Sequence, residues 1–564
     1  MSARPELPFG LEPTAKPQRE LFDAELAIDR DGPHQFEIGI PMRDGVELAA
    51  LVHLPAADQR PAPAIVHGTP YGKLEHEQEG VQRRIDAGYA LVFYDTRGRG
   101  SSEGEWQPLS MVDAFDGHDA VEWVAAQEWC SGAVGAEGLS YDGWITMATV
   151  SQQPPHLKAA IPFSPAGRWQ EEIPYQHGCF QLFFVWWWAM VRRRIMEQPD
   201  AAPELLELLP IEAAGERINP AGPGWREFME HETLDELWRA RRWDGECSFD
   251  VPCLHVTGWH DREDLTGAFH HYEEMIASSP ARDRQWLLVG PWTHVSTRWP
   301  SDTYAGVTYP DAALDMTAIE LRFFDHFLKG VDNGVEEEPR VRIYDPGAGQ
   351  WKVRPAWEGG TREQEIFLGA GGRLLEEAGP DGEDVYRYDP MKPNGMKYPT
   401  DVLPLEPPLD LSEFESQDGV VGWTGEPLAE DVTVRGWGEL ELWAATDRED
   451  TEWYVKLADV GPDGPPLWVA WGCLRASFGE DPREPAAVTP GERRRYRVEL
   501  TPTFHTFRAG HRFRVLLSSS EYPWFARNMN RFEPIGRQHE PLVATNTVFH
   551  GDGAPSRLRL RVEE

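Results

Sequence analysis

The hydrophobic pattern changes character along this chain, and those changes constrain its fold more than any other feature. From residue 36 to about 164, short apolar runs such as PAIVHGTPY and YALVFYDTRG alternate with helical spacing, as in 111–127. Such alternation favours a mostly parallel sheet with helices on its faces. It stops between about 166 and 245, where the segment is helical and rich in Trp, Arg and Glu, and returns with VPCLHVTGWHD and QWLLVGPWTH. We therefore predict an α/β core with a helical insertion over its sheet.

After about residue 345 the pattern acquires period two. The clearest examples are WGELELWAATD, EWYVKLADV, RRYRVEL, HRFRVLLSSS and RLRLRVEE, separated by Gly, Pro and Asp turns. Alternation of this kind predicts a separate antiparallel sandwich or jelly roll. The expected organisation is an N-terminal arm over 1–35, an α/β domain over 36–165 and 246–345, a helical cap over 166–245 and a β domain over 346–564.

Charge and composition exclude several classes of partner. The chain has 94 acidic and 54 basic side chains, a formal net charge of −40, so nucleic acid and anionic membranes would repel it. MSARPELPFGLEPTAKPQRE lacks the apolar core of a signal peptide, and the apolar run 180–191 is shorter than the roughly 20 residues of a membrane span. The five scattered cysteines contain no CxxC pair. We expect a cytoplasmic protein with no metal or organic cofactor.

The segment Gly138-Leu139-Ser140-Tyr141-Asp142-Gly143 carries the strongest local signal. A serine at a sharp strand-to-helix turn needs small neighbours, because the turn pushes its hydroxyl out above the sheet. The generic motif has its second glycine two residues after the serine, whereas here it comes three after. On this motif alone, an ordinary turn is an equal alternative.

Two later residues complete a possible catalytic set. Asp261 and His294 each follow a predicted strand, and α/β-hydrolases carry their triad in the order serine, acid, histidine. Taken singly, Asp261 is more simply a helix cap and His294 a hydrogen-bonded loop histidine. The ordered set favours a nucleophilic serine.

These residues also carry a family resemblance. GLSYDG resembles the G-x-S-Y-x-G motif of the cocaine-esterase and Xaa-Pro dipeptidyl-peptidase (CocE/NonD-type) group of α/β-hydrolases, in which the glycine has this same spacing. Further matching stretches are PMRDGVELAA, TPYGK, DTRGRGSSEGEW, GWHD, GPWTH, PLAEDVTVRG, AGHRFRVLLSSS and PWFARNMN. The resemblance therefore covers nearly the whole chain after residue 36.

The resemblance implies a fold and a set of roles. The fold is an α/β-hydrolase core with an inserted helical cap and a C-terminal all-β jelly roll of the galactose-binding-like kind. Ser140 would be the nucleophile, Asp261 the acid and His294 the base. The hydroxyl of Tyr71 and the backbone N–H of Tyr141 would form the oxyanion hole. The resemblance and the arm also lead us to expect a homo-oligomer.

Substrate recognition has two interpretations. DRED at 261–264 is similar to a stretch of α-amino-acid ester hydrolases, in which Glu263 and Asp264 would belong to an acidic cluster that holds the substrate's ammonium. A third acid would come from the start of the cap, as Glu171 or Glu172. The alternative is a charged first helical turn.

The three adjacent indoles at 186–188 are a further candidate for substrate contact. Neighbours on a helix lie about 100° apart, so the three cannot share one face. We expect at least one, Trp187, to face the substrate, with core packing as the alternative.

We predict a serine hydrolase that cleaves a small-molecule ester or amide through an acyl-serine. The alternative within this class is an α-amino-acid ester hydrolase, a β-lactam acylase or an Xaa-Pro dipeptidyl-peptidase. The alternative from another class is a non-catalytic carbohydrate-binding protein with a vestigial triad. The intact set of catalytic residue types argues against that.

Overall fold

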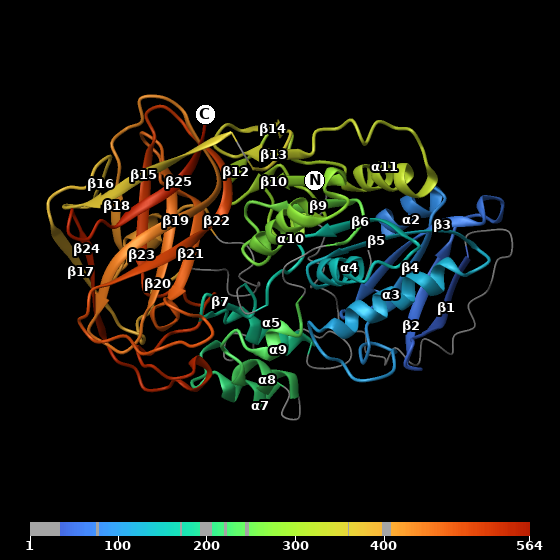
Figure 1. Cartoon of the computed structure of the whole chain (residues 1–564), viewed down its shortest axis with the longest axis horizontal. Coiled ribbons are helices and arrows are strands. Elements are labelled where there is room, and N and C mark those ends of the chain that lie inside the picture. Colours follow the sequence, from blue (N-terminus) through green and yellow to red (C-terminus); the bar gives the residue numbers. More distant parts are fainter. Residues whose placement is uncertain are drawn as a thin grey trace.

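The protein, described by a computed structural model, has an α/β part and a β part that lie side by side (Figure 1). The described residues are 34–74, 78–169, 172–191, 206–218, 223–242, 248–358, 360–396 and 408–564. The predicted arm over 1–35 lies outside them, except for residues 34 and 35, which begin the first strand. Glu171 also lies outside the described residues.

The α/β part is built on a ten-stranded sheet in the order β1-β2-β4-β3-β5-β6-β9-β10-β13-β14. Adjacent strands are parallel from β4 through to β13, and the pairs at the two ends are antiparallel. The strands are β1 (His34–Pro41), β2 (Glu47–Leu54), β3 (Ala62–Thr69), β4 (Ala90–Asp95), β5 (Cys130–Leu139), β6 (Leu157–Phe163), β9 (Cys253–Gly258), β10 (Gln285–Gly290), β13 (Val341–Asp345) and β14 (Gln350–Arg354).

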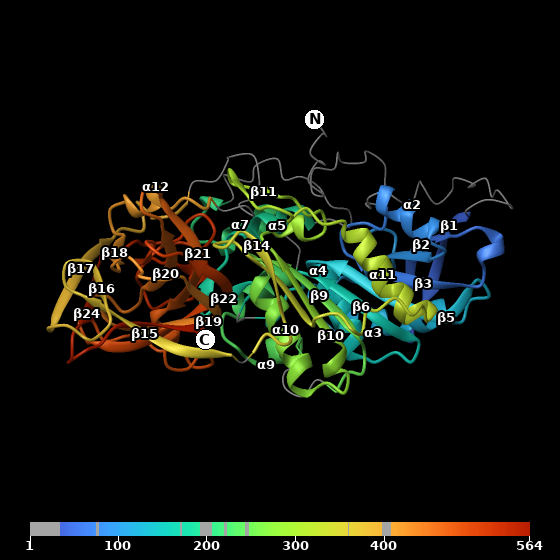
Figure 2. The same cartoon turned by 90° about the horizontal axis from the view of Figure 1, so that it is seen from above.

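Helices cover both faces of this sheet (Figure 2). They are α2 (Gln78–Asp86), α3 (Met111–Ala125), α4 (Tyr141–Ser151), α10 (Leu265–Ser278) and α11 (Met316–Lys329). The first four residues of strand β4, Ala90 to Phe93, are all apolar because the strand is buried on both faces. Ala90 and Val92 pack in one hydrophobic cluster with α3 and α4, whereas Leu91 and Phe93 pack in another with α2 and α11. A strand buried on both faces reads as a continuous apolar run.

The predicted insertion contains helices and one small hairpin. Its described elements are β7 (Tyr175–Gln176), β8 (Cys179–Phe180), α5 (Phe183–Val191), α7 (Glu212–Ile218), α8 (Pro223–Glu230) and α9 (Glu236–Arg239). Sequence periodicity did not predict the hairpin, because two-residue strands show no period. The whole of α5 is buried, and it shares a hydrophobic cluster with α4 and with Trp471 and Phe525 of the β part.

The β part contains a second, eleven-stranded sheet assembly. Its pairs are antiparallel apart from β16 with β18. The strands are β15 (Thr361–Gly369), β16 (Arg373–Leu375), β17 (Gly382–Tyr388), β18 (Val421–Thr424), β19 (Val432–Thr446), β20 (Glu452–Val460), β21 (Pro466–Arg475), β22 (Arg494–Phe507), β23 (Arg512–Ser518), β24 (Ala544–His550) and β25 (Arg557–Glu563). All five segments with predicted period two are strands. Leu440 and Leu442 of β19 point into one interior with Val455 and Leu457 of β20, as alternation requires.

Smaller elements complete the described part of the chain. They are the hairpin β11 (Thr303–Tyr304) and β12 (Val307–Thr308), the helix α12 (Ser412–Glu415) and the 3-10 turns Ala57–Gln59, Arg282–Arg284, Val295–Thr297, Ala476–Phe478 and Ile535–Arg537. The boundary expected at 346 falls inside a hairpin, because β14 pairs with β13 and extends the first sheet to Arg354. Within the described part, no helix combines the length and the apolar character needed to cross a bilayer.

Candidate active site

Ser140 lies in a strained turn between β5 and α4. Its φ of 65° is in the left-handed region, which residues with a side chain rarely adopt. A Cβ on Gly138 would lie 2.4 Å from the carbonyl group of Asp142, and a Cβ on Gly143 would lie 2.6 Å from the carbonyl oxygen of Phe163. Both flanking glycines are therefore needed for close backbone contacts, and the spacing of Gly143 follows from its contact with the end of β6.

Asp261 and His294 come together because their strands, β9 and β10, are parallel neighbours. The loops that follow these strands are also joined, since the backbone N–H of His260 donates to the carbonyl of Trp292 at 2.9 Å. A Cβ on Gly258 would lie 2.1 Å from that same carbonyl oxygen, so the approach requires glycine. Nδ1 of His294 lies 3.1 Å from each carboxylate oxygen of Asp261. This is the geometry of a carboxylate that orients an imidazole.

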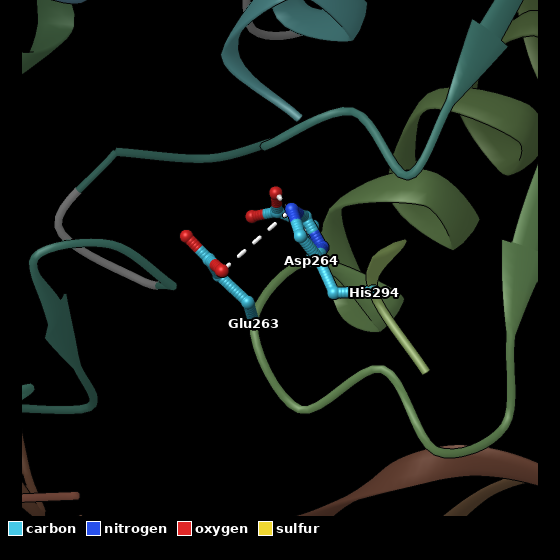
Figure 3. A group of neighbouring side chains, drawn as sticks. All are labelled: Glu263, Asp264 and His294. Atoms are coloured by element: carbon cyan, nitrogen blue, oxygen red, sulfur yellow. Dashed lines mark ion pairs between the residues drawn. The ribbon is translucent and has the colours of Figure 1, made fainter. Parts of the chain in front are cut away.

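The other imidazole nitrogen is available for chemistry. Nε2 of His294 is buried and has no hydrogen-bond partner among the described residues, and Oε2 of Glu263 lies 3.6 Å from it (Figure 3). Within the described chain, no hydrogen bond joins Ser140 to His294 either. Catalytic hydrogen bonds are often long in a free enzyme and tighten when substrate binds. The structure thus brings together two of the three predicted triad members and places the third in the turn that follows β5, a strand of the same parallel sheet.

Tyr71, Tyr141 and Trp187 form an aromatic group beside the Ser140 turn. The ring centroids of Tyr71 and Tyr141 lie 6.5 Å apart, and those of Tyr141 and Trp187 lie 6.4 Å apart. The indole N–H of Trp187 donates to the hydroxyl oxygen of Tyr71 at 3.1 Å. Burial and the nearby Asp142 raise the pKa of Tyr71 well above its ordinary value, so this hydroxyl keeps its proton. The backbone N–H of Tyr141 is in the first turn of α4, where no intrahelical acceptor exists.

An acidic cluster lies beside His294, with Glu263 3.6 Å from Nε2 and Asp264 3.9 Å from Nδ1. Neither carboxylate oxygen of Asp264 has a hydrogen-bond partner among the described residues, although its side chain is 1% exposed. Burial and the charge of Glu263 raise the pKa of Asp264 well above its ordinary value. Glu172, from the start of the insertion, contributes to the same electrostatic cluster and bonds through one oxygen to Nδ1 of His270. Of the two acids proposed from the sequence, the structure places Glu172 here, whereas Glu171 lies outside the described residues.

The cluster is suited to a cation. Glu263, Asp264 and His294 offer ligand atoms that all lie within 4.8 Å of one another, a set that could hold a metal ion or an ammonium group. Burial would lower the pKa of His294, but the surrounding carboxylates outweigh burial and raise it above its ordinary value. A bound cation would oppose those carboxylates and lower the pKa again.

Three features of the site were not predicted from the sequence. Nε2 of His67, on β3, lies 2.8 Å from a carboxylate oxygen of Asp142, directly behind the Ser140 turn. His270 pairs with Glu172. The buried Trp187 bonds to the hydroxyl of Tyr71 and also packs in the hydrophobic cluster that α5 shares with α4. Each contact joins residues far apart in the sequence, and no local motif marks it.

Two family models match the chain, one in each part. The family described as X-Pro dipeptidyl-peptidase (S15 family) matches residues 44–296. The family described as X-Pro dipeptidyl-peptidase C-terminal non-catalytic domain matches residues 333–559. The β part thus corresponds to a domain that is recognised as separate from the catalytic one.

Similar proteins agree with these matches. Cocaine esterase of Rhodococcus sp. (strain MB1 Bresler) is 27% identical over 576 residues, covering 93% of this chain and 97% of that protein. A putative serine esterase of Mycobacterium bovis is 26% identical, covering 86% of this chain and 90% of its own length. A solved α-amino acid ester hydrolase has a TM-score of 0.85 at 24% identity, covering 98% of this chain and 100% of its own, and so shares the fold. The chain therefore carries a domain that matches the S15 family over residues 44–296, and it is a serine hydrolase that acts on ester or amide bonds.

Proposed function

We propose that Ser140 is the nucleophile, His294 the general base and Asp261 the group that orients the base. The observation that carries this proposal is the contact of Asp261 with Nδ1 of His294, while Nε2 has no hydrogen-bond partner among the described residues. The hydroxyl oxygen of Ser140 attacks the substrate carbonyl carbon while Nε2 takes its proton. The imidazolium then protonates the leaving alcohol or amine, and an acyl-serine remains. Water repeats the sequence, releasing the acid and restoring the serine.

We further propose that Tyr71 and Tyr141 supply the oxyanion hole. The Tyr71 hydroxyl, which accepts from Trp187 and keeps its own proton, would donate to the negative oxygen of the tetrahedral intermediate. The backbone N–H of Tyr141 would be the second donor, at the start of α4, where the helix dipole also favours negative charge. Trp187 would thus act chiefly by orienting Tyr71.

The second candidate is an enzyme for substrates with an α-ammonium group. Glu263, Asp264 and Glu172 would hold this cation, and the observation that favours it is the buried Asp264 carboxylate, which has no hydrogen-bond partner among the described residues. Buried carboxylates of this kind gain most from a paired cation.

The larger framework supports either substrate class: we propose an α/β-hydrolase core, consistent with the largely parallel sheet, and a jelly roll for the β part.

Labelling with a fluorophosphonate tests the nucleophile. The wild-type protein should react at one residue and lose its esterase activity, because a serine that a base has activated attacks the phosphorus of the probe, displaces fluoride and becomes phosphonylated. Ser140→Ala should remain unlabelled and inactive, as read by intact-protein mass spectrometry. Wild type without label, or equal labelling of Ser140→Ala, would contradict the triad and favour a non-catalytic binding protein.

Removal of the Tyr71 hydroxyl tests the oxyanion hole. Tyr71→Phe should lower kcat about 10²- to 10³-fold, corresponding to ~2.7–4 kcal/mol of lost transition-state stabilisation. Its KM should change little, because the lost hydrogen bond forms mainly in the transition state. Steady-state kinetics on an activated ester would measure both values. A KM effect with wild-type kcat would instead assign Tyr71 to ground-state binding.

Two esters that differ only in the ammonium group test the second candidate. Phenylglycine methyl ester should have a lower KM than its des-amino analogue. The pH at which its kcat increases should also be lower, because the ammonium opposes the carboxylates that raise the pKa of His294. His294 must be neutral to accept the serine proton, so activity rises as pH passes upward through its pKa.

Glu263→Gln is the matched variant for this experiment. It should raise the KM of the amino ester about 10-fold or more, as expected for the loss of one charged hydrogen bond. It should also shift the kcat profile of the des-amino ester to lower pH, since one carboxylate that raises the pKa of His294 is gone. If the two esters behave alike and Glu263→Gln alters neither, there is no ammonium site.

A further inference from the structure

Arg262 stands between Asp261 and Glu263 in sequence, yet its side chain leaves the active site and enters the β part. Its side chain is 1% exposed. Its guanidinium carbon lies 5.0 Å from the ring centroid of Trp468, 5.3 Å from that of Trp471 and 4.9 Å from that of Trp524. Three indoles of the β part thus surround a cation that belongs to the acid-bearing loop of the α/β part.

One carboxylate of the β part balances this cation. Oε1 of Glu521, which follows β23, lies 3.1 Å from Nη2 of Arg262. Oε2 of Glu521 lies 2.7 Å from Nζ of Lys456 on β20. The three side chains are each at most 2% exposed, so two buried cations share one buried carboxylate. Buried charges separate from their partners only at a large cost, which fixes Arg262 opposite Glu521.

The short loop around Arg262 transmits this constraint to the site. The backbone N–H groups of Glu263 and Asp264 both donate to Oδ1 of Asp261 at 3.0 Å. That same oxygen lies 3.1 Å from Nδ1 of His294. Any displacement of the Arg262 backbone would therefore move the donors that hold the Asp261 carboxylate against the imidazole.

We propose that Arg262 is a positioning residue, through which Glu521 and the indoles of the β part hold the acid loop against His294. The proposal rests on the proposed function of Asp261 and His294, and it gives the β part a role in catalysis without any contact with the reacting atoms. Loss of Arg262 should misalign Asp261 against His294, so it should change kcat and leave the two parts assembled.

Other contacts join the two parts without involving this loop. The hydroxyl of Thr506 donates to Oδ2 of Asp345 at 2.6 Å, and the indole N–H of Trp437 donates to Oε1 of Glu273 at 2.8 Å. The β part should therefore remain docked when Arg262 is replaced, which makes a loss of loop alignment separable from a loss of docking.

Arg262→Met and Lys456→Met form a matched pair for the test. Each removes one of the two cations that face Glu521, and each leaves the carboxylate with one partner and an apolar chain of similar length among the aromatic rings. Burial lowers the pKa of Lys456 to about 8. Only Arg262 is attached to the acid loop. Comparison of the two variants therefore separates the positioning of the acid loop by Arg262 from the charge balance around Glu521.

Arg262→Met should lower kcat on an activated ester up to about 100-fold, the scale expected for misplacing a catalytic group by 1 Å. Its KM should stay within about threefold of the wild-type value, because misalignment of the acid loop affects the chemical step and not ground-state binding. Lys456→Met should keep the wild-type kcat. Circular dichroism and the melting temperature would establish that both variants fold. Wild-type kcat in a folded Arg262→Met, or an equal fall in both variants, would overturn the proposal.

Arg262→Lys decides the question if Arg262→Met does not fold. It keeps a cation opposite Glu521 but loses the planar guanidinium that lies among the three indoles, so kcat should fall by about tenfold. Wild-type kcat in this variant would contradict the positioning role. Fluorophosphonate labelling of the wild type separates the proposed triad from the proposed role of Arg262. Absence of label contradicts the triad itself. A labelled wild type together with fully active Arg262 variants contradicts only the positioning role of Arg262.

Discussion

The contact between Asp261 and His294 is the interaction on which the rest of the site depends. It exists because β9 and β10 end side by side in a parallel sheet, and because Gly258 lets the two following loops touch at the carbonyl of Trp292. Ser140 reaches the same edge from β5, so the ends of three parallel strands supply the nucleophile, the acid and the base of the proposed mechanism. Ligands in open α/β sheets bind at such carboxyl ends.

Charge balance is the second constraint on this site. His294 has several carboxylates around it and little solvent, so the free protein favours the protonated imidazole. An enzyme arranged in this way gains from a cationic substrate, which both fills the acidic cluster and releases the base. The cluster draws its acids from separate places, Glu263 and Asp264 from the acid loop and Glu172 from the insertion. The insertion would thereby contribute to substrate choice, as variable loops commonly do on shared folds.

Sequence reasoning predicted the parts of this molecule that local pattern encodes. The turn at Ser140, the strands before Asp261 and His294 and the alternating strands of the β part all have a period or a turn signature. Periodicity carries no information on which sheet a strand joins, so the boundary expected at 346 fell before β14, which pairs with β13 in the first sheet. It also gave no sign that Arg262 points away from its neighbours or that Trp187 bonds to Tyr71, because both contacts join segments more than a hundred residues apart.

The central claim is that acyl transfer passes through Ser140 with His294 as its base, and trapping of the intermediate tests it most directly. Rapid acid quench of the protein with a slowly deacylated ester, followed by peptide mass spectrometry, would locate the acyl group. The account predicts the added acyl mass on the peptide that contains Ser140, in wild type and not in Ser140→Ala. An acyl group on another residue, or full turnover by Ser140→Ala, would contradict it.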